Sequence, residues 1–170
     1  MHPSKKARIL NGKRGGVAGK AAVMGLLDRH GKDAVSQVRT VVLTGRRRSH
    51  IQPEVRKHVE SGSAVYTDAL MSYYGLSSDY LHGVIDHAET YVDGQVHTNG
   101  LENFWSLLKR ALKGTYVSVE PFHLFRYLDE QSFRFNTRKL TDAARFVLAA
   151  SSVFGKRLTF NQLTAADATC

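Results

Sequence analysis

The chain has 170 residues, of which 42% are hydrophobic and 23% charged, and this composition is typical of one ordinary globular domain rather than of a disordered chain. No apolar run approaches the ~18 residues that a membrane span needs, and the first residues, MHPSKKARIL, lack the apolar core of a signal peptide. The single cysteine, Cys170, cannot form an internal disulfide, so we expect a cytoplasmic protein without a membrane partner.

The net charge of +9 at pH 7 is unevenly distributed. Residues 1–48 hold 12 of the 24 lysines and arginines but only two acidic residues, Asp28 and Asp33. Basic side chains that neutralise phosphates release condensed counterions, which gives affinity for a polyanion without reading its sequence. The N-terminal part therefore predicts a nucleic-acid partner, and a solvated basic surface without a partner is the alternative.

The first half of the chain predicts a flexible segment followed by strands and one helix. Residues 1–19 are polar, basic and rich in glycine, which predicts a flexible basic segment. The apolar runs at residues 20–29 and 38–45 predict two strands of one sheet. A helix is expected over residues 52–61, with Pro53 near its first turn, where a missing N–H costs nothing.

Two short strands and three helices are expected further along. The strands are predicted at residues 63–70 and 83–85. An apolar stripe at three- and four-residue spacing predicts a helix that ends near Gly114 and is formed by Leu101, Phe104, Trp105, Leu108 and Leu112. Further helices are expected from Pro121 and over residues 142–154. With no internal repeat and no clear linker, residues 1–170 are predicted to form a single α/β or α+β domain.

Two motifs are absent on inspection. The run GGVAGKAA is not a phosphate-binding loop, because Arg14 stands where the first glycine is needed and Ala21 stands where a Ser or Thr would hold magnesium. A zinc site is also not predicted, because no thiolate accompanies the candidate ligands and their spacing fits no standard site. Those candidates are His82, Asp86, His87 and His97.

Two acidic residues are better candidates for chemistry. Asp68 follows a predicted strand, and open α/β sheets place their ligands at the carboxyl ends of strands; the alternative is a simple turn residue. Glu102 lies three residues after Asn99, which would suit a helix-capping box. However, Glu102, Ser106, Lys109 and Lys113 share one helix face, an arrangement that suits a metal beside a phosphate backbone. Spacing alone leaves both interpretations of Glu102 open.

Three stretches closely resemble bacterial insertion-sequence transposases of the ISXO-like branch: VYTDAL (residues 65–70), the long run from residue 85 to residue 138 that contains HTNGLENFWSLLKR, and GKRLTF (residues 155–160). The resemblance covers nearly the whole chain. It implies the DDE superfamily of DNA transposases, with a ribonuclease H-like catalytic fold in which a mixed sheet is flanked by helices. It therefore implies DNA recombination by transposition in a bacterial cytoplasm, close to the nucleoid.

The resemblance also implies a mechanism and roles for particular residues. Three carboxylates would hold two Mg²⁺ ions, or Mn²⁺, about 3.5–4 Å apart, for hydrolysis of a phosphodiester and then strand transfer into target DNA. Asp68 would be the second carboxylate and Glu102 the third, with Asn99 and Asn103 as substitutes for Glu102 and His97 as a supporting hydrogen-bonding residue. Trp105 is expected in the core. DNA at transposon ends and at the target would contact Lys109, Lys113, Arg46, Arg47 and Arg48. A homodimer on paired ends is expected.

One part of the family pattern is not found. In the family, the first carboxylate lies on the central strand in an Asp-Glu-Thr context, and MHPSKKARI resembles the loop after that strand. We therefore expect a chain that begins just after this strand and that, alone, is weakly active at best. The alternative function is a non-catalytic DNA-binding remnant or repressor derived from a transposase.

Overall fold

The computed structural model describes residues 20–29, 35–85 and 99–164, so the predicted flexible segment at residues 1–19 lies outside the described residues. The elements in chain order are β1 (Ala22–Asp28), β2 (Gln37–Leu43), α2 (Arg48–His58), β3 (Ala64–Asp68), η1 (Met71–Tyr73), η2 (Leu76–Ser78), β4 (Leu81–Ile85), α3 (Asn99–Gly114), η3 (Pro121–His123), α4 (Leu124–Asn136), α5 (Asp142–Ser151) and α6 (Phe160–Thr164). This mixture of strands and helices confirms the α/β class. No helix in the described ranges is long and apolar enough to cross a bilayer.

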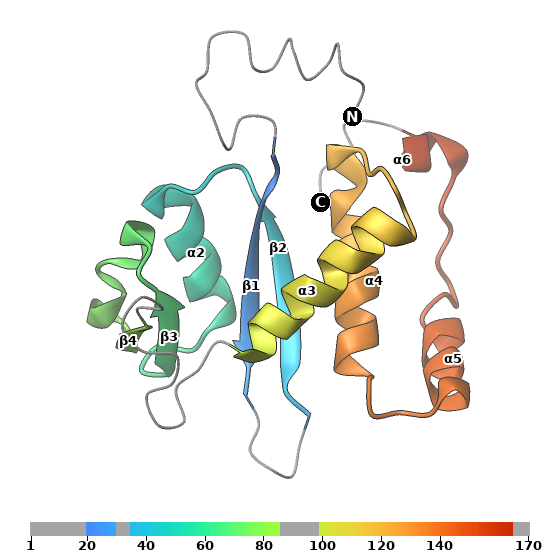
Figure 1. The fold of residues 1–170 in the computed structure, drawn as a ribbon. Coiled ribbons are helices and arrows are strands. Elements are labelled where there is room, and N and C mark those ends of the chain that lie inside the picture. Colours follow the sequence, from blue (N-terminus) through green and yellow to red (C-terminus); the bar gives the residue numbers. More distant parts are fainter. Residues whose placement is uncertain (1–19, 30–34, 86–98, 165–170) are drawn as a thin grey trace, which may run out of the picture.

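The first two strands form an antiparallel hairpin in which Ala22 pairs with Leu43 and Asp28 with Gln37. This confirms the two strands predicted from the apolar runs. Alternate side chains of β1 point to opposite faces of the hairpin. Met24 lies in a core cluster with α2, and Leu27 packs against the cluster of α3 and α4. The hairpin is therefore covered by helices on both faces, as Figure 1 shows.

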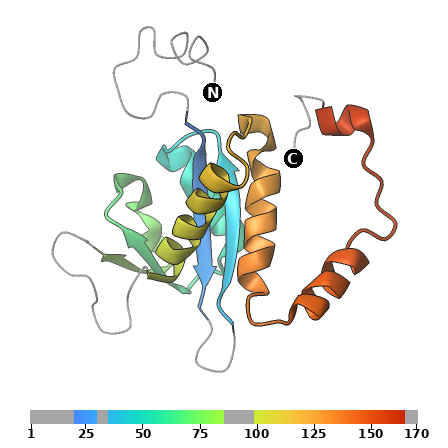
Figure 2. The ribbon, with the colours of Figure 1, turned by 45° about the vertical axis from the view of Figure 1, so that its right-hand side comes forward.

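The other two strands form a separate, parallel pair in which Ala64 aligns with Leu81 and Asp68 with Ile85. Both strands were predicted, but the described strands form two sheets of two strands rather than one mixed sheet. In Figures 1 and 2 the β3–β4 pair lies on the side of β1 that faces away from β2, and β3 is the nearer of the two to β1. Within the described residues, the outer edges of β1 and β3 have no strand partner.

Helix α2 begins at Arg48, four residues before the predicted start, so the prediction that Pro53 lies near the first turn was wrong. Two side chains one turn apart, Ile51 and Val55, are buried against β1 and explain the earlier start. The extended Arg47 precedes the helix, and its carbonyl accepts the N–H of Ile51 at 3.2 Å. Pro53 consequently stands inside the helix, where it removes one backbone hydrogen bond.

Helices α3 and α4 cover the other face of the hairpin, with Phe104, Leu108, Leu128 and Phe135 fully or almost fully buried. Gly25 allows this contact, because a Cβ atom there would lie 2.6 Å from the Trp105 ring. Trp105 is thus a core residue, as predicted. The C-terminal helices differ: α5 ends three residues before the predicted residue 154, and α6 was not predicted. Both lie apart from the other helices in Figures 1 and 2.

Candidate active site

Asp68 is the last residue of β3, and its side chain is exposed. One carboxylate oxygen, Oδ1, accepts the backbone N–H of Leu70 at 3.3 Å, so Asp68 also shapes the turn that follows the strand. The nearby Tyr73 was not singled out in the sequence. Burial, and secondly the negative charge of Asp68, raise the pKa of the Tyr73 hydroxyl. Tyr73 lies five residues on and approaches Asp68 only because the chain turns through η1, which no sequence period would reveal.

The strand pair next to Asp68 is held together by side chains from both strands. Thr67 Oγ1 and His82 Nε2 form a hydrogen bond of 2.9 Å, and the ring of Tyr66 lies so close to Gly83 that a Cβ atom there would be 2.8 Å from it. His82 therefore has a partner in the sheet. The other three candidates of the rejected zinc cluster, Asp86, His87 and His97, lie outside the described residues. Among the residues that are described, no group of three or more His, Cys, Asp or Glu side chains could hold a metal.

Helix α3 presents the polar face that the sequence spacing predicted. The side chains of Glu102, Asn103, Ser106, Lys109 and Lys113 are exposed, opposite the buried Phe104 and Leu108. Glu102 stands in the first turn of the helix. The helix starts at Asn99, but the side chain of Asn99, like His97, is outside the part of the chain that is described. A line of one carboxylate followed by two lysines thus runs along the outside of α3.

The three arginines Arg46, Arg47 and Arg48 are exposed at the start of α2 and make no ion pair with the described residues. Arg47 and Arg48 line an open pocket together with Arg56 and the polar Ser49 and Gln52. Arg56 differs from them, because its Nε donates to Asp79 Oδ2 at 2.8 Å. This hydrogen bond holds the pKa of Asp79 below its usual value. At the start of α2, the positive charge that has no ion-pair partner among the described residues therefore lies at residues 46–48.

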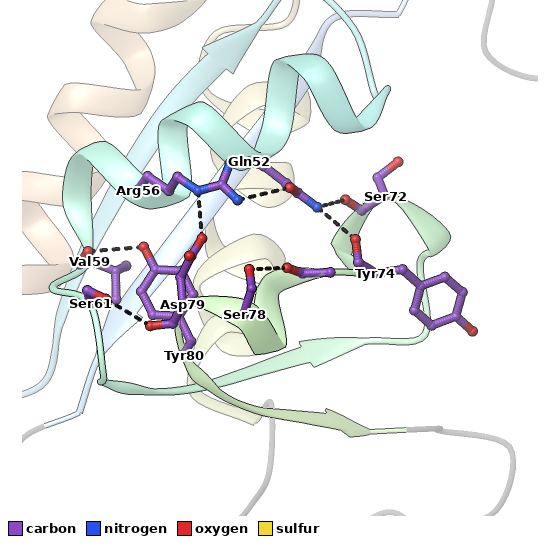
Figure 3. Close-up of polar contacts among 10 residues, drawn as sticks. Gln52, Arg56, Val59, Ser61, Ser72, Tyr74, Ser78, Asp79 and Tyr80 are labelled. Carbon is purple, nitrogen blue, oxygen red and sulfur yellow. Dashed lines mark hydrogen bonds and ion pairs between the residues drawn. The ribbon is translucent and has the colours of Figure 1, made fainter.

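Buried Gln52 connects this basic segment to the loop after Asp68. Its amide nitrogen donates to the carbonyls of Ser72 (3.1 Å) and Tyr74 (2.9 Å), and Figure 3 shows these bonds reaching from α2 to the η1 segment. Ser72 Oγ donates in turn to the carbonyl of Arg46 at 2.6 Å. The arginine segment and the loop of Asp68 are thus fixed to each other. Sequence reasoning did not find Gln52, because a glutamine in an amphipathic helix gives no signal of its own.

The structure therefore links the loop that follows Asp68 with the arginine segment. Glu102, Lys109 and Lys113 come from a different element, α3, whose first turn packs on β1: a Cβ atom at Gly100 would lie 2.7 Å from the side chain of Leu27. Both carboxylates are solvent-accessible. Such an arrangement offers oxygen ligands for a cation and basic groups for a phosphate backbone.

Comparison with known proteins identifies the family. The model of the ISXO2-like transposase domain matches residues 1–136. An uncharacterized transposase-like protein of Haemophilus influenzae is 32% identical over 105 residues, which cover 61% of this chain and 85% of that protein. No solved structure matches the chain. The chain therefore belongs to the ISXO2-like family of insertion-sequence transposases.

Proposed function

We propose that the chain is the catalytic part of a DDE transposase, which hydrolyses phosphodiesters at insertion-sequence ends and transfers the strand to target DNA with a divalent metal. The observation that carries this proposal is the position of Asp68. It is an exposed carboxylate at the carboxyl end of a parallel strand, and Gln52 and Ser72 tie its loop to the segment of three exposed arginines, Arg46 to Arg48. Carboxyl ends of parallel strands are where α/β proteins place their chemistry.

Asp68 and Glu102 are the proposed metal ligands. Their hard oxygen atoms suit Mg²⁺ or Mn²⁺, and Asp68 Oδ2 stays available when Oδ1 accepts the Leu70 N–H. Asn99, Asn103 and His97 are the proposed supporting residues on the same stretch. A bound metal would activate the attacking oxygen and stabilise the leaving one. The described residues supply two carboxylates, so a third is needed for the two-metal arrangement.

The third carboxylate is proposed to lie on a strand between β1 and β3. The outer edges of both strands lack a partner among the described residues, and an unpaired buried backbone group costs roughly 1–3 kcal/mol. A strand in that position would join the two small sheets into the single mixed sheet of a ribonuclease H-like fold. It would also stand next to Asp68.

Positive side chains from two elements are proposed to hold the DNA. Arg46, Arg47 and Arg48 lie on the loop and first turn of α2, whereas Lys109 and Lys113 lie on α3, seven and eleven residues after Glu102. Contacts to phosphates position the DNA without reading its sequence. Two copies, one on each transposon end, are proposed to act together near the nucleoid. Residues 1–170 are proposed to form one domain, in which residues 1–19 add further basic side chains.

A non-catalytic DNA-binding protein derived from a transposase is the second candidate. The observation that favours it is that the described residues hold no cluster of three possible ligands. The two candidates differ in metal dependence. A transposase needs Mg²⁺ to change its DNA, whereas a repressor binds transposon ends equally well in a chelator.

The test starts from the DNA upstream of the Met1 codon, translated in frame. A strand-like run with Asp-Glu-Thr there would be added to the chain, and cleavage and strand transfer would be measured with and without Mg²⁺. We expect activity in the extended chain that Asp68→Ala and Glu102→Ala each reduce at least ~1,000-fold, or about 4 kcal/mol in the barrier. Strand transfer by the 170 residues alone would refute the need for an additional strand between β1 and β3. Full activity of Asp68→Ala would refute the site.

A further inference from the structure

Residues 140–164, here called the C-terminal arm, contain α5 and α6 and follow the part of the chain that the transposase family model matches. Within the described residues, the hydrogen bonds of the arm join residues three or four positions apart, and the one that leaves the arm is at its base, where the N–H of Leu140 donates to the carbonyl of Thr137 at 2.9 Å. No residue of α5 or α6 is buried. Isolated helices of this length are marginal in water, so the arm needs a surface to pack against.

The arm exposes a large apolar area. Phe146, Phe154 and Phe160 are 73%, 84% and 76% exposed, and at about 200 Å² for each ring side chain they present on the order of 450 Å². Val147, Leu148, Val153 and Leu158 are also exposed and enlarge this area. The largest apolar patch of a typical monomer is about 300–600 Å², and each partner in a standard interface buries about 800 Å². The three rings alone thus equal the largest apolar patch of a typical monomer and supply about half of what one partner in a standard interface buries.

Helix α5 is apolar on too many sides for a single contact surface. Phe146, Val147 and Leu148 are consecutive and all exposed, and because successive residues of a helix turn by about 100°, they span about 200° of its circumference. A helix that packs on one surface needs an apolar stripe only about 100° wide. Two packing surfaces are therefore required to bury α5. A single molecule offers at most one of them, on the adjacent α4.

The outer face of α4 has complementary properties. Phe122 in η3 and Phe133 in α4 are exposed, and Asp129 lies between them at helical spacing, seven and four residues away. Asp129 makes no ion pair with the described residues, and partial burial raises the pKa of its carboxyl group. The arm carries two exposed cations among its apolar residues, Lys156 and Arg157. The chain thus contains both an apolar arm that carries two cations and an apolar surface that carries the carboxylate of Asp129.

The arm does not reach this surface in its own molecule. Two hydrogen bonds fix the residue from which the arm departs: Arg138 Nη1 donates to the carbonyls of Ser36 (2.9 Å) and Phe135 (2.7 Å). Beyond Arg138, the ribbon of α5 and α6 is set apart from α4 in both views. An arm that extends from its own molecule and matches a surface of that molecule can be exchanged between two identical copies. Such an exchange produces a domain-swapped, symmetric dimer.

We infer that the C-terminal arm packs on a second copy of this chain, with α5 held between the two molecules and Lys156 close to Asp129 of the other copy. The inference rests on the proposal that two copies act together, and it names the surface that joins them. Dimerisation through the arm requires neither DNA nor metal, so it is tested without either and its failure is separate from failure of the proposed chemistry.

The first test is the molar mass of the full 170-residue chain by light scattering and sedimentation equilibrium, in the absence of DNA and divalent metal. We expect a dimer, and a dissociation constant that rises at least ~100-fold when Phe146→Asp and Phe154→Asp are combined. Both positions are exposed in the single chain, so the variant should fold normally, which circular dichroism checks. Met71→Asp is the matched control: Met71 is 75% exposed but lies on η1, so this change should leave the dimer intact.

The second test determines which copy the arm contacts. Equal amounts of ¹⁵N-labelled and unlabelled chain are mixed, treated with a carbodiimide that joins a carboxylate directly to an amine, and digested for mass spectrometry. Linked Asp129 and Lys156 peptides of mixed isotope composition are expected. Linked peptides of a single isotope composition only would mean that the arm folds back on its own α4, and would overturn the inference. A monomer at ~0.1 mM, or a dimer that the double arm substitution leaves unchanged, would overturn it as well.

Discussion

The two strand pairs of this molecule are built in opposite ways. The β1–β2 hairpin is covered by α2 on one face and by α3 and α4 on the other, and it contributes Met24 and Val38 to the two core clusters. The β3–β4 pair exposes Tyr66, Leu81 and Val84 and carries Asp68 at its end. The covered pair holds the fold together, whereas the exposed pair holds the group proposed for chemistry.

Residues that determine stability and residues proposed for function therefore lie in different parts of the chain. Substitutions in the covered pair and its helices should change the free energy of unfolding, and substitutions at the ends of β3 and α3 should change DNA chemistry or binding alone. Gln52 lies at the junction, because it is buried on α2 but bonded to the loop after β3. A substitution at Gln52 should therefore change both the free energy of unfolding and the loop that follows Asp68.

The largest change in stability is expected from Phe104→Ala. Phe104 has no exposed surface and packs edge-on against both Trp105 and Phe135, so truncation leaves a cavity and costs about 3–5 kcal/mol. Tyr66→Ala, in the exposed pair, should cost less than half as much. Urea unfolding followed by circular dichroism measures both. Equal losses of unfolding free energy would mean that the two strand pairs contribute equally to stability.

Gln52→Leu should have an intermediate effect on stability, about 1–3 kcal/mol. The leucine fills the same space but leaves the carbonyls of Ser72 and Tyr74 without their donor. The loop after Asp68 should also loosen, which faster amide exchange at residues 71–74 would reveal. If Gln52→Leu lowered stability without affecting exchange in this loop, the junction proposed between the two regions would not exist.

A smaller, pH-dependent effect is expected from Tyr116→Phe. The Tyr116 hydroxyl donates to Glu130, and this bond lowers the pKa of the Glu130 carboxyl from 4.5. A carboxyl whose folded pKa is lowered stabilises the fold above its unfolded pKa and loses that contribution as the pH falls through the folded value. Glu130 is partly exposed, so solvent screening limits the difference to about 1 kcal/mol or less at pH 7. Once the pH falls below the lowered pKa of Glu130 the two proteins should converge, whereas a stability difference that stays constant from neutral pH into the acid range would contradict this origin.

The smallest effect is expected on DNA binding by Arg47→Ala. Losing one phosphate contact should weaken binding a few-fold for all sequences and reduce the slope of log affinity against log salt by about 1. Lys57→Ala is a matched control, because it removes the same charge from the other end of α2, where Lys57 faces Glu54. Anisotropy titrations at several salt concentrations measure both. Identical slopes for the two variants would mean that the arginine segment is merely solvated.

Local patterns were sufficient for most elements and for one face of the candidate site. The apolar runs of β1 and β2 and the stripe of α3 predicted their elements, and the same stripe placed Glu102, Lys109 and Lys113 on the opposite face. The start of α2 was missed because Pro53 usually marks a first turn, whereas tertiary burial of Ile51 extended the helix. The helix α6 is only five residues long and has no apolar period to detect.

The contacts that give the site its surroundings could not be predicted. Gln52 finds its acceptors twenty and twenty-two residues away, and the charge of Asp68 acts on Tyr73 across a turn. Neither effect leaves a repeating pattern in the sequence. The separation of the strands into two sheets also depends on pairing between distant residues, which propensity does not determine.

The central claim, that Asp68 and Glu102 hold one metal ion together, is tested most directly by adding Mn²⁺ to the ¹⁵N-labelled chain and following paramagnetic broadening of its amide signals. The account predicts that signals around Asp68 and in the first turn of α3 broaden with the same midpoint, and that Asp68→Asn and Glu102→Gln each abolish both effects. Asn and Gln keep the shape and remove the charge, so neither substitution should unfold the protein. Broadening at only one of the two carboxylates, or survival of both effects in either variant, would contradict the claim.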